Sequence, residues 1–242
     1  MKICVAQTRP VKGDISLNIQ HHKKLLALAL LYGADTIIFP ELSITGYEPE
    51  LAKSLATTPD DPRFNEFQQI SNAKNITIGI GMPVKSPAGP MIGMIIFQPN
   101  VPKQTYFKQH LHADELPFFV NGQKPLFLTN DRQKISLAIC YELSVPEHAA
   151  NAYENGAGIY IASVAKTAVG VEKAGKSLAD IARNYSMTVL MSNCIGHCDN
   201  FDAGGKTAVW NDKGILLGQL NDTNEGILII DTDTQELIEK TI

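Results

Sequence analysis

The sequence lacks any uninterrupted run of eighteen apolar residues, which predicts that no segment spans a membrane. It also lacks a strong charge of either sign: 21 Lys and Arg face 25 Asp and Glu, for a formal net charge of −4. The basic residues are dispersed, so there is no basic patch for nucleic acid. The opening residues 1–7 follow a strand pattern without the apolar core or cleavage site of a signal peptide. We therefore expect a cytoplasmic protein that binds neither nucleic acid nor membranes.

Cysteine is scarce, with four residues in 242: Cys4, Cys140, Cys194 and Cys198. A chain of this length does not need disulfide bonds to support its core, and reduced thiols are the norm in the cytosol. A free, nucleophilic cysteine is therefore chemically plausible.

Short runs rich in Ile, Val and Leu alternate with turn residues along the chain, a pattern typical of β-strands. The clearest predicted strands are 3–6, 36–39, 76–80, 91–97, 105–108, 135–140, 159–162, 189–192, 207–210 and 227–230. Helical spacing predicts helices at about 17–31, 62–74, 146–155 and 171–187, with a short final helix near 235–240.

These ten predicted strands are more than one doubly wound sheet uses. The pattern favours an α/β fold with two central sheets and helices outside both, which is a four-layer α-β-β-α sandwich. No interior change in composition marks a boundary, so we expect a single domain over residues 1–242.

Cys140 is the first candidate for chemistry, because it closes the apolar run 135–139 and precedes a predicted helix that begins at Pro146. A thiol at the end of a strand lies where backbone N–H groups can stabilise a developing oxyanion. Free cysteine is also among the most buried residue types, so a packing role is the alternative.

Histidine is the usual base for a cysteine nucleophile, yet none of the six histidines follows a strand in the way that marks a base. His21 and His22 are expected on the solvated face of the helix 17–31. A Cys–His pair therefore has no support in the sequence.

Charged residues at strand ends are better candidates. Glu41 follows the predicted strand 36–39, and Lys108 ends the strand 105–108. Three strands can thus bring Glu41, Lys108 and Cys140 to one end of a sheet. Because unpaired buried charge is costly, the two charged groups need partners. The alternative is a structural Glu–Lys ion pair beside an inert thiol.

Three segments resemble the signature blocks of the carbon–nitrogen hydrolase (nitrilase) superfamily: Phe39-Pro40-Glu41-Leu42, Tyr106-Phe107-Lys108-Gln109-His110-Leu111 and Cys140-Tyr141-Glu142-Leu143-Ser144-Val145-Pro146-Glu147. They occur in the family's order and at similar separations, and the likeness covers nearly the whole chain. The resemblance implies an α-β-β-α sandwich with a Glu-Lys-Cys triad that hydrolyses non-peptide C–N bonds, usually amides. It also implies assembly into homodimers or larger homo-oligomers.

The resemblance also implies roles for individual residues. Cys140 is the expected nucleophile and Glu41 the expected general base. Lys108 is expected to stabilise the tetrahedral intermediate together with the backbone N–H of Tyr141. Glu115 lies where many members have a second supporting glutamate, the alternative being a loop carboxylate that faces solvent.

The substrate is not readable from the sequence. Leu143-Ser144, the run 181–185 and Gly205-Lys206-Thr207 depart from the family pattern at positions that bear on the pocket and subunit contacts. The resemblance also implies that Tyr141, at a position where nitrile-hydrolysing members tend to carry Trp, favours an amide over a nitrile. An N-carbamoyl compound remains an alternative.

We expect the pocket to include Tyr47, Phe118 and Lys166, with a core role for one of Phe118 and Phe119. Lys166 can meet an acidic substrate or can be ordinary surface charge. The triad does not distinguish water from an amine as acyl acceptor, and a non-catalytic binding protein on this fold is the competing class.

Cys194, His197 and Cys198 place three soft ligands within five residues, which suggests a metal site. No fourth ligand stands at a spacing typical of zinc. We therefore expect neither a metal nor a cofactor.

Overall fold

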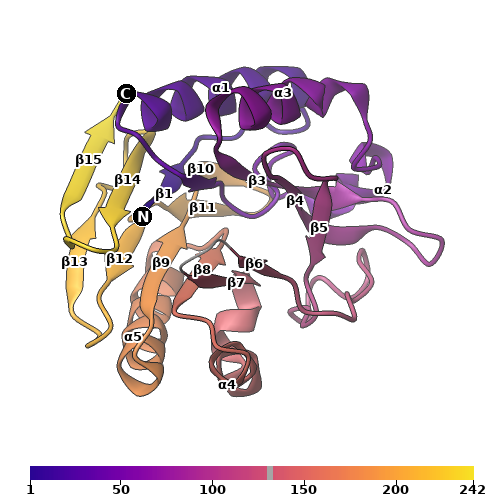
Figure 1. The fold of residues 1–242 in the computed structure, drawn as a ribbon. Helices are drawn as coiled ribbons and strands as arrows, with labels where there is room; N and C mark the ends of the chain where they lie inside the picture. The colour runs from indigo at the N-terminus through magenta and orange to yellow at the C-terminus, as the bar shows by residue number, and fades with distance from the viewer. Residues whose placement is uncertain (130–132) are drawn as a thin grey trace.

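The computed structural model describes residues 1–129 and 133–242. Its elements form four layers, with α1 and α3 above one sheet and α4 and α5 below a second sheet (Figure 1). The fold class predicted from the sequence is therefore confirmed.

The upper sheet has seven strands, and β1, β2 and β3 run parallel at its centre. Their neighbours pair antiparallel. In spatial order the strands are β15 (Leu237–Thr241), β14 (Gly226–Asp231), β1 (Lys2–Gln7), β2 (Thr36–Ile38), β3 (Thr77–Val84), β4 (Met91–Phe97) and β5 (Gln104–Phe107).

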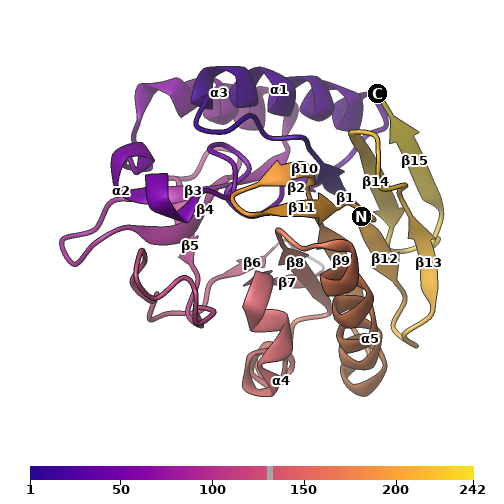
Figure 2. The same ribbon diagram turned by 180° about the vertical axis from the view of Figure 1, so that it is seen from behind.

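The lower sheet has six strands, with β7, β8 and β9 parallel at its centre. In spatial order these are β13 (Leu216–Gln219), β12 (Ala208–Trp210), β9 (Thr188–Ser192), β8 (Ile159–Ser163), β7 (Lys134–Ile139) and β6 (Phe127–Thr129). A separate hairpin of β10 (Ile195–Cys198) and β11 (Phe201–Gly204) is joined to the segment after β1 by a bridge between Thr8 and Cys194 (Figure 2).

The helices cover the outer faces of the two sheets. The α-helices are α1 (Ile15–Leu31), α2 (Ala52–Leu55), α3 (Asn65–Lys74), α4 (Pro146–Glu154) and α5 (Ala168–Tyr185). Three short 3₁₀ helices complete the described part of the chain: η1 (Pro49–Leu51), η2 (Pro62–Phe64) and η3 (Cys140–Ser144). No helix in the described ranges is long and apolar enough to cross a membrane.

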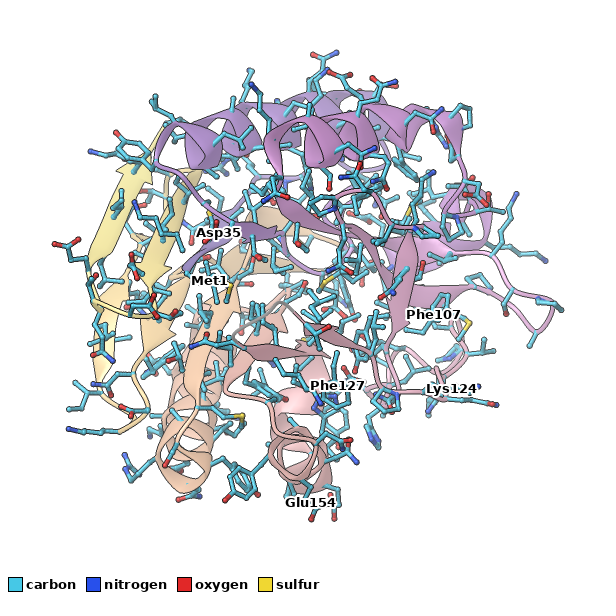
Figure 3. The ribbon with its side chains drawn as sticks, in the orientation of Figure 1. Met1, Asp35, Phe107, Lys124, Phe127 and Glu154 are labelled. Carbon is cyan, nitrogen blue, oxygen red and sulfur yellow. The ribbon has the colours of Figure 1, made fainter. Side chains whose placement is uncertain are left out.

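Three clusters of buried apolar side chains lie between the layers. One cluster includes side chains of both sheets, among them Val5, Ile38, Leu137 and Ile161. Side chains fill the space between the two sheets (Figure 3). A second cluster joins α1 and α3 to the upper sheet, and a third joins α4 and α5 to the lower sheet. The parallel strands are buried on both faces, which explains their continuous apolar runs.

The prediction of a short final helix near 235–240 is wrong. This segment is the edge strand β15, which pairs antiparallel with β14. The Asp231 side chain accepts hydrogen bonds from the N–H groups of Asp233 and Thr234 and closes the intervening turn. A hairpin therefore satisfies the backbone where a short helix would leave most of its polar groups without partners.

Candidate active site

Three strands bring the predicted catalytic residues to one edge of the sandwich. Glu41 follows β2, Lys108 follows β5 and Cys140 begins η3 directly after β7. Two antiparallel pairings separate β3 from β5, so β5 runs in the direction of β2 and ends at the same edge. The N–H of Lys108 still donates to Ile92 O at 2.9 Å, which holds its backbone in register with β4.

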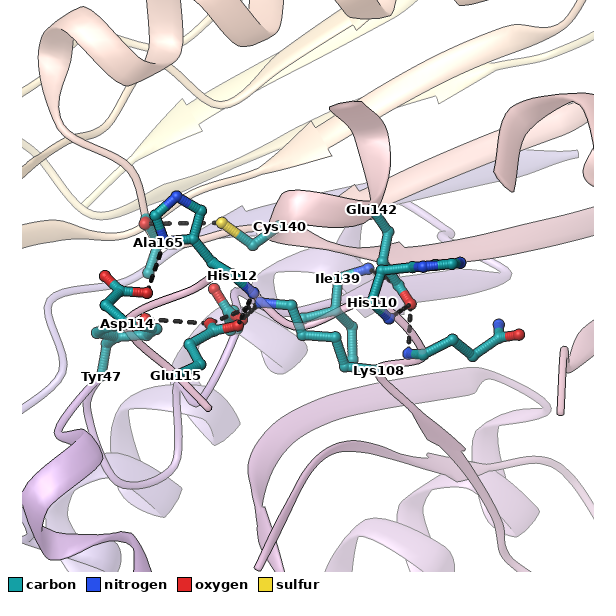
Figure 4. A network of polar contacts seen from close by, with 12 residues as sticks. Tyr47, Lys108, His110, His112, Asp114, Glu115, Ile139, Cys140, Glu142 and Ala165 are labelled. Carbon is teal, nitrogen blue, oxygen red and sulfur yellow. Dashed lines mark hydrogen bonds and ion pairs between the residues drawn. The ribbon is translucent and has the colours of Figure 1, made fainter. Parts of the chain in front are cut away.

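The charged side chains form a buried cluster beside Cys140 (Figure 4). Lys108 Nζ lies 2.8 Å from Glu41 Oε1 and 2.7 Å from Glu115 Oε1. All three side chains are at most 1% exposed. One cation between two carboxylates gives the cluster a net negative charge in an apolar setting, which favours a proton on one of its members.

The two carboxylates differ in their hydrogen bonds. Glu115 Oε1 also accepts from the Tyr47 hydroxyl at 3.0 Å, and Oε2 accepts from the His112 N–H at 2.8 Å. Glu41 uses only Oε1, and its buried Oε2 has no hydrogen-bond partner among the described residues. Glu115 is thus held by fixed donors on both oxygens, whereas Glu41 has an oxygen free to receive a proton. The alternative interpretation of Glu115 as a loop carboxylate that faces solvent is wrong, because the residue is buried.

Burial is the main cause of the pKa shifts in this cluster. It raises the pKa of Glu41 to about 7, with Lys108 opposing the shift and Glu115 adding to it. Desolvation, followed by the charge of Glu41, raises the pKa of the Cys140 thiol to about 11. Burial alone would lower the pKa of Lys108, but Glu41, Cys140 and Glu115 together raise it. At neutral pH the lysine is charged and the resting thiol is protonated.

Cys140 has an unusual backbone conformation, with φ at +45°. For a residue with a Cβ this left-handed region is sparsely populated and costs on the order of 1–3 kcal/mol. The turn ends β7 abruptly and starts η3, so the thiol is presented at the strand end, half-buried and 4.0 Å from Ala165 O. The N–H of Tyr141 lies in the first turn of η3, where the helix supplies no acceptor.

Glu142 holds this turn in place, and sequence reasoning missed it. Its Oε2 accepts from the Ile139 N–H at 2.6 Å and from the Tyr106 hydroxyl at 2.7 Å. Its Oε1 accepts from the Gln109 N–H at 2.5 Å. One fully buried carboxylate therefore ties the backbone beside Cys140 to the backbone beside Lys108. The residue lay within the third signature block, but its bonding partners were not readable from it.

We expect Glu142→Ala to lower the free energy of unfolding by about 3 kcal/mol or more, because several buried donors lose their acceptor. Urea unfolding followed by circular dichroism measures the change. Glu147→Ala, which removes an exposed carboxylate from α4, is the matched control and should change stability by less than about 0.5 kcal/mol. Equal stability of the two variants would contradict this structural role.

His22 also departs from expectation. It is buried rather than solvated, and its ring stacks on Phe39 with centroids 4.1 Å apart. His22 Nε2 lies 2.8 Å from Ser43 Oγ, and the neighbouring Asn18 donates to Ile44 O. Desolvation lowers the pKa of His22 to about 3, so the ring is neutral. The helix α1 thus supports the loop that carries Glu41.

Two further contacts fix this loop. Ser163 Oγ, at the end of β8, donates to Phe39 O at 2.8 Å and so links the two sheets beside the site. Gly81 in β3 lies under the loop, where an added Cβ would come within 2.5 Å of Pro40 O. A side chain at Gly81 would therefore displace Glu41.

A cavity of about 670 Å³ opens onto Cys140. Its walls include Tyr47, Phe118 and Lys166, the three residues predicted to line the pocket, together with Glu115 and Tyr141. Phe119 is buried in the core between the sheets. The cavity is large enough for a small organic substrate, with the thiol at its wall.

Cys194 and Cys198 lie together, with their sulfur atoms 3.7 Å apart, and both are buried. His197 points elsewhere and pairs with Asp202 at the surface. Within residues 1–129 and 133–242, no group of three or more His, Cys, Asp or Glu side chains is arranged to hold a metal ion.

Comparison with known protein families finds a match over nearly the whole chain. The sequence pattern of the family described as "Carbon-nitrogen hydrolase" matches residues 2–240.

Curated relatives that match almost the whole chain differ in their own length, as two of them show. The glutamine-dependent NAD(+) synthetase of Thermotoga maritima is 24% identical over 250 residues, which is 98% of this chain but 42% of that protein. The "Hydrolase in agr operon" of Staphylococcus aureus is 25% identical over 245 residues, covering 98% of this chain and 93% of that protein. The chain thus spans less than half of the synthetase and most of the staphylococcal hydrolase.

Among solved structures, an amidase from Nesterenkonia sp. AN1 superposes with a TM-score of 0.86 at 23% identity, covering 96% of this chain and 90% of the amidase. That structure is a variant with the acetamide moiety of fluoroacetamide added covalently to its active-site cysteine. Another variant of the same amidase was solved in complex with butyramide. At this level of identity the likeness shows the shared fold.

Proposed function

Because the chain belongs to the carbon–nitrogen hydrolase family, we propose that it hydrolyses a small carboxamide through a thioester on Cys140. The observation that carries the proposal is the buried Glu41–Lys108–Glu115 cluster beside a half-buried thiol that faces a cavity. Such a cluster supplies a base and a fixed cation next to a nucleophile, as acyl transfer requires.

In the first half of the reaction, Glu41 accepts the thiol proton as Cys140 Sγ attacks the carbonyl carbon of the amide. The unpartnered Oε2 of Glu41 is suited to receive this proton. The charge that develops on the carbonyl oxygen is stabilised by the Lys108 ammonium and the backbone N–H of Tyr141. Glu41 then returns the proton to the nitrogen as the C–N bond breaks, which releases ammonia and leaves a thioester.

In the second half, Glu41 accepts a proton from water, and the hydroxide attacks the thioester carbon. Collapse of this intermediate breaks the C–S bond, releases a carboxylic acid and returns the proton to Cys140. Glu115 touches no reacting atom in this scheme. It holds Lys108 and Tyr47 in position through Oε1, while the His112 N–H fixes Oε2.

The proposal is tested by ammonia release from a panel of small amides, nitriles and N-carbamoyl compounds, with Cys140→Ala as the control. Butyramide belongs in the panel because the structural neighbour binds it, and glutamine because the synthetase relatives depend on it. We expect Cys140-dependent ammonia release from at least one carboxamide and weaker or no release from the nitriles. Ammonia release from nitriles alone, or from N-carbamoyl compounds alone, would contradict the amide assignment and identify the protein as a hydrolase of that other class.

A non-catalytic binding role is the competing proposal, and thiol labelling separates the two. Because Cys140 faces the cavity and Glu41 can accept its proton, it should react with iodoacetamide at neutral pH faster than the buried Cys4, Cys194 and Cys198. An inert Cys140, together with an inactive panel, would favour the binding protein.

The pH dependence follows from the raised pKa of Glu41. The general base must be ionised, and burial raises its pKa to about 7. Its ionised fraction therefore grows as the pH rises, so kcat/KM for the amide should increase about tenfold per pH unit below about 7 and level off above it. A profile measured from about pH 5 to 9 checks this. A midpoint near about 4.3, the value of an ordinary glutamate, would contradict the assignment.

A further inference from the structure

Three buried side chains behind the active site form a series of hydrogen bonds that ends on Glu142. The Tyr106 hydroxyl lies 2.7 Å from Glu142 Oε2, and His148 Nε2 lies 2.9 Å from the same hydroxyl oxygen. His148 Nδ1 in turn lies 2.9 Å from the Tyr160 hydroxyl oxygen. All four side chains are buried. Tyr106, His148 and Tyr160 are termed the Tyr–His bridge.

The Tyr–His bridge joins the two halves of the sandwich (Figure 1). Tyr106 lies in β5 at one edge of the upper sheet, Tyr160 lies in β8 of the lower sheet, and His148 lies in α4 on the outer face of the lower sheet. In the described part of the upper sheet, β5 pairs with β4 alone. The position of β5 relative to the lower sheet therefore depends on side-chain contacts, and the bridge is one of them.

Glu142 holds the chain on both sides of Lys108. Its Oε2 accepts from the hydroxyl of Tyr106, two residues before Lys108, and its Oε1 accepts from the N–H of Gln109, the next residue. The same Oε2 also accepts from the N–H of the residue before Cys140. The position of the Lys108 ammonium relative to the thiol thus depends in part on how firmly Glu142 holds the Tyr106 hydroxyl.

The charge states of the groups give the hydrogens of the bridge one direction. Burial lowers the pKa of His148 to about 4, so the ring is neutral near pH 7 and carries one N–H. Burial raises the pKa of Glu142, but its hydrogen bonds from two backbone N–H groups and from Tyr106 favour the ionised form. A carboxylate has no hydrogen to donate, so the hydroxyl of Tyr106 donates to Glu142.

One tautomer of His148 fits this direction. Because the only hydroxyl hydrogen of Tyr106 goes to Glu142, His148 donates from Nε2 to the Tyr106 oxygen and accepts at Nδ1 from the Tyr160 hydroxyl. Hydrogen bonds in series strengthen one another in a buried setting. The Gln109 side chain also reaches the Tyr106 oxygen, at 3.1 Å, but it is only partly buried. His148 is therefore the buried donor that orients the Tyr106 hydroxyl toward Glu142.

His148 itself lies outside the cavity at Cys140. It lines a second cavity of about 220 Å³ together with Tyr106, Gln109 and Asn151, and the two cavities share no lining residue. A substrate at the thiol does not reach the imidazole. Any effect of His148 on the reaction must therefore pass through other residues.

We propose that His148 is a positioning residue for the reaction at Cys140, acting through the Tyr106 hydroxyl and Glu142 to hold Lys108 in place beside the thiol. This rests on the proposed amidase function and adds a residue that supports it from outside the cavity.

Two substitutions of His148 separate hydrogen bonding from packing. Leucine has no polar side-chain atom, whereas glutamine has both a donor and an acceptor. His148→Leu should lower kcat for an amide about 10- to 100-fold and leave KM within about twofold of wild type, because the catalytic geometry changes and the substrate cavity does not. His148→Gln should recover kcat to within about threefold of wild type. His21→Leu, which removes a half-buried imidazole from α1, is the matched control and should leave kcat unchanged.

A double variant tests whether His148 acts through Tyr106. Tyr106→Phe removes the hydroxyl that receives the hydrogen bond from His148. If the two residues act in series, Tyr106→Phe combined with His148→Leu should have the kcat of Tyr106→Phe alone, within about twofold. Losses that multiply would show that His148 acts independently of the hydroxyl and would overturn the proposal.

The hydrogen-bond direction is tested on the unaltered protein, so the result does not depend on how any variant folds. ¹⁵N NMR of the histidine rings, correlated with the backbone signals of the same residues, distinguishes the two neutral tautomers and the charged ring. His148 should be neutral at pH 7 with its hydrogen on Nε2. A hydrogen on Nδ1, or a doubly protonated ring, would overturn the proposed bridge.

The kinetic outcomes are also distinguishable. Wild-type kcat in His148→Leu, or equal losses in His148→Leu and His148→Gln, would overturn the positioning role, while Cys140-dependent hydrolysis by the wild-type protein would still support the proposed function. Absence of ammonia release by the wild-type protein from every amide would overturn both.

Discussion

Replacing Cys140 by alanine is expected to lower amide hydrolysis by about 10⁴-fold or more, because it removes the nucleophile that forms the proposed acyl intermediate. The fold should persist. Alanine keeps the Cβ, so the positive φ at this position is no more strained than before. The free energy of unfolding should stay within about 1 kcal/mol of wild type. Ammonia release and urea unfolding measure the two effects.

The matched control is Cys4→Ala, which removes a thiol from β1 beneath α1, away from the cavity. It should retain wild-type turnover even if it loses some stability. Wild-type rates in Cys140→Ala would exclude the thioester, and equal losses in both variants would indicate damage to the fold rather than to the nucleophile.

The second large effect is expected from Glu41→Gln, which should lower kcat by about 10² to 10⁴-fold. The amide side chain cannot accept the thiol proton, yet it keeps the size of glutamate and can still accept a hydrogen bond from Lys108 Nζ. Lys108 also keeps its ion pair with Glu115. The rise of kcat/KM near pH 7 should disappear in this variant, since the group whose pKa is about 7 is gone.

Asp61→Asn is the control for Glu41→Gln, because Asp61 is also buried and paired with a cation, Arg63, but lies outside the site. It should leave kcat and the pH profile unchanged. Near-wild-type activity of Glu41→Gln would show that another group acts as the base. A pH midpoint retained in this variant would show that a group other than Glu41 produces the midpoint.

The layers of the fold could be predicted because they depend on local pattern. Buried parallel strands such as β7 and β8 are continuous apolar runs, and α1 and α4 are followed by the glycine stop signals Gly33 and Gly156. The short strands β6, β10, β11 and β13 were not predicted, because each has only three or four residues, too few to show a strand pattern. For β15 the local pattern was misleading, since an edge strand and a short helix both tolerate a run such as 235–240.

The candidate triad could be predicted from the sequence because it also depends on a local pattern. Glu41, Lys108 and Cys140 each follow a buried strand, where a charge or a thiol is unexpected, and the three signature segments linked them. The structure brings these three side chains together with Glu115.

The supporting contacts could not be predicted from the sequence. Glu142 reads as an ordinary helix-start carboxylate, yet it binds donors that lie 33 and 36 residues away. His22 stands in a polar run, and only the packing of α1 on the upper sheet buries it.

The most direct test of the central claim is peptide mapping by mass spectrometry of enzyme quenched in acid during turnover of an amide. We predict a transient mass increase equal to the acyl group, confined to the peptide that contains Cys140 and absent from Cys140→Ala. Its decay should match the rate of acid release. Amide hydrolysis at the normal rate with an adduct on another residue, or with unmodified Cys140 at every quench time, would contradict the thioester mechanism.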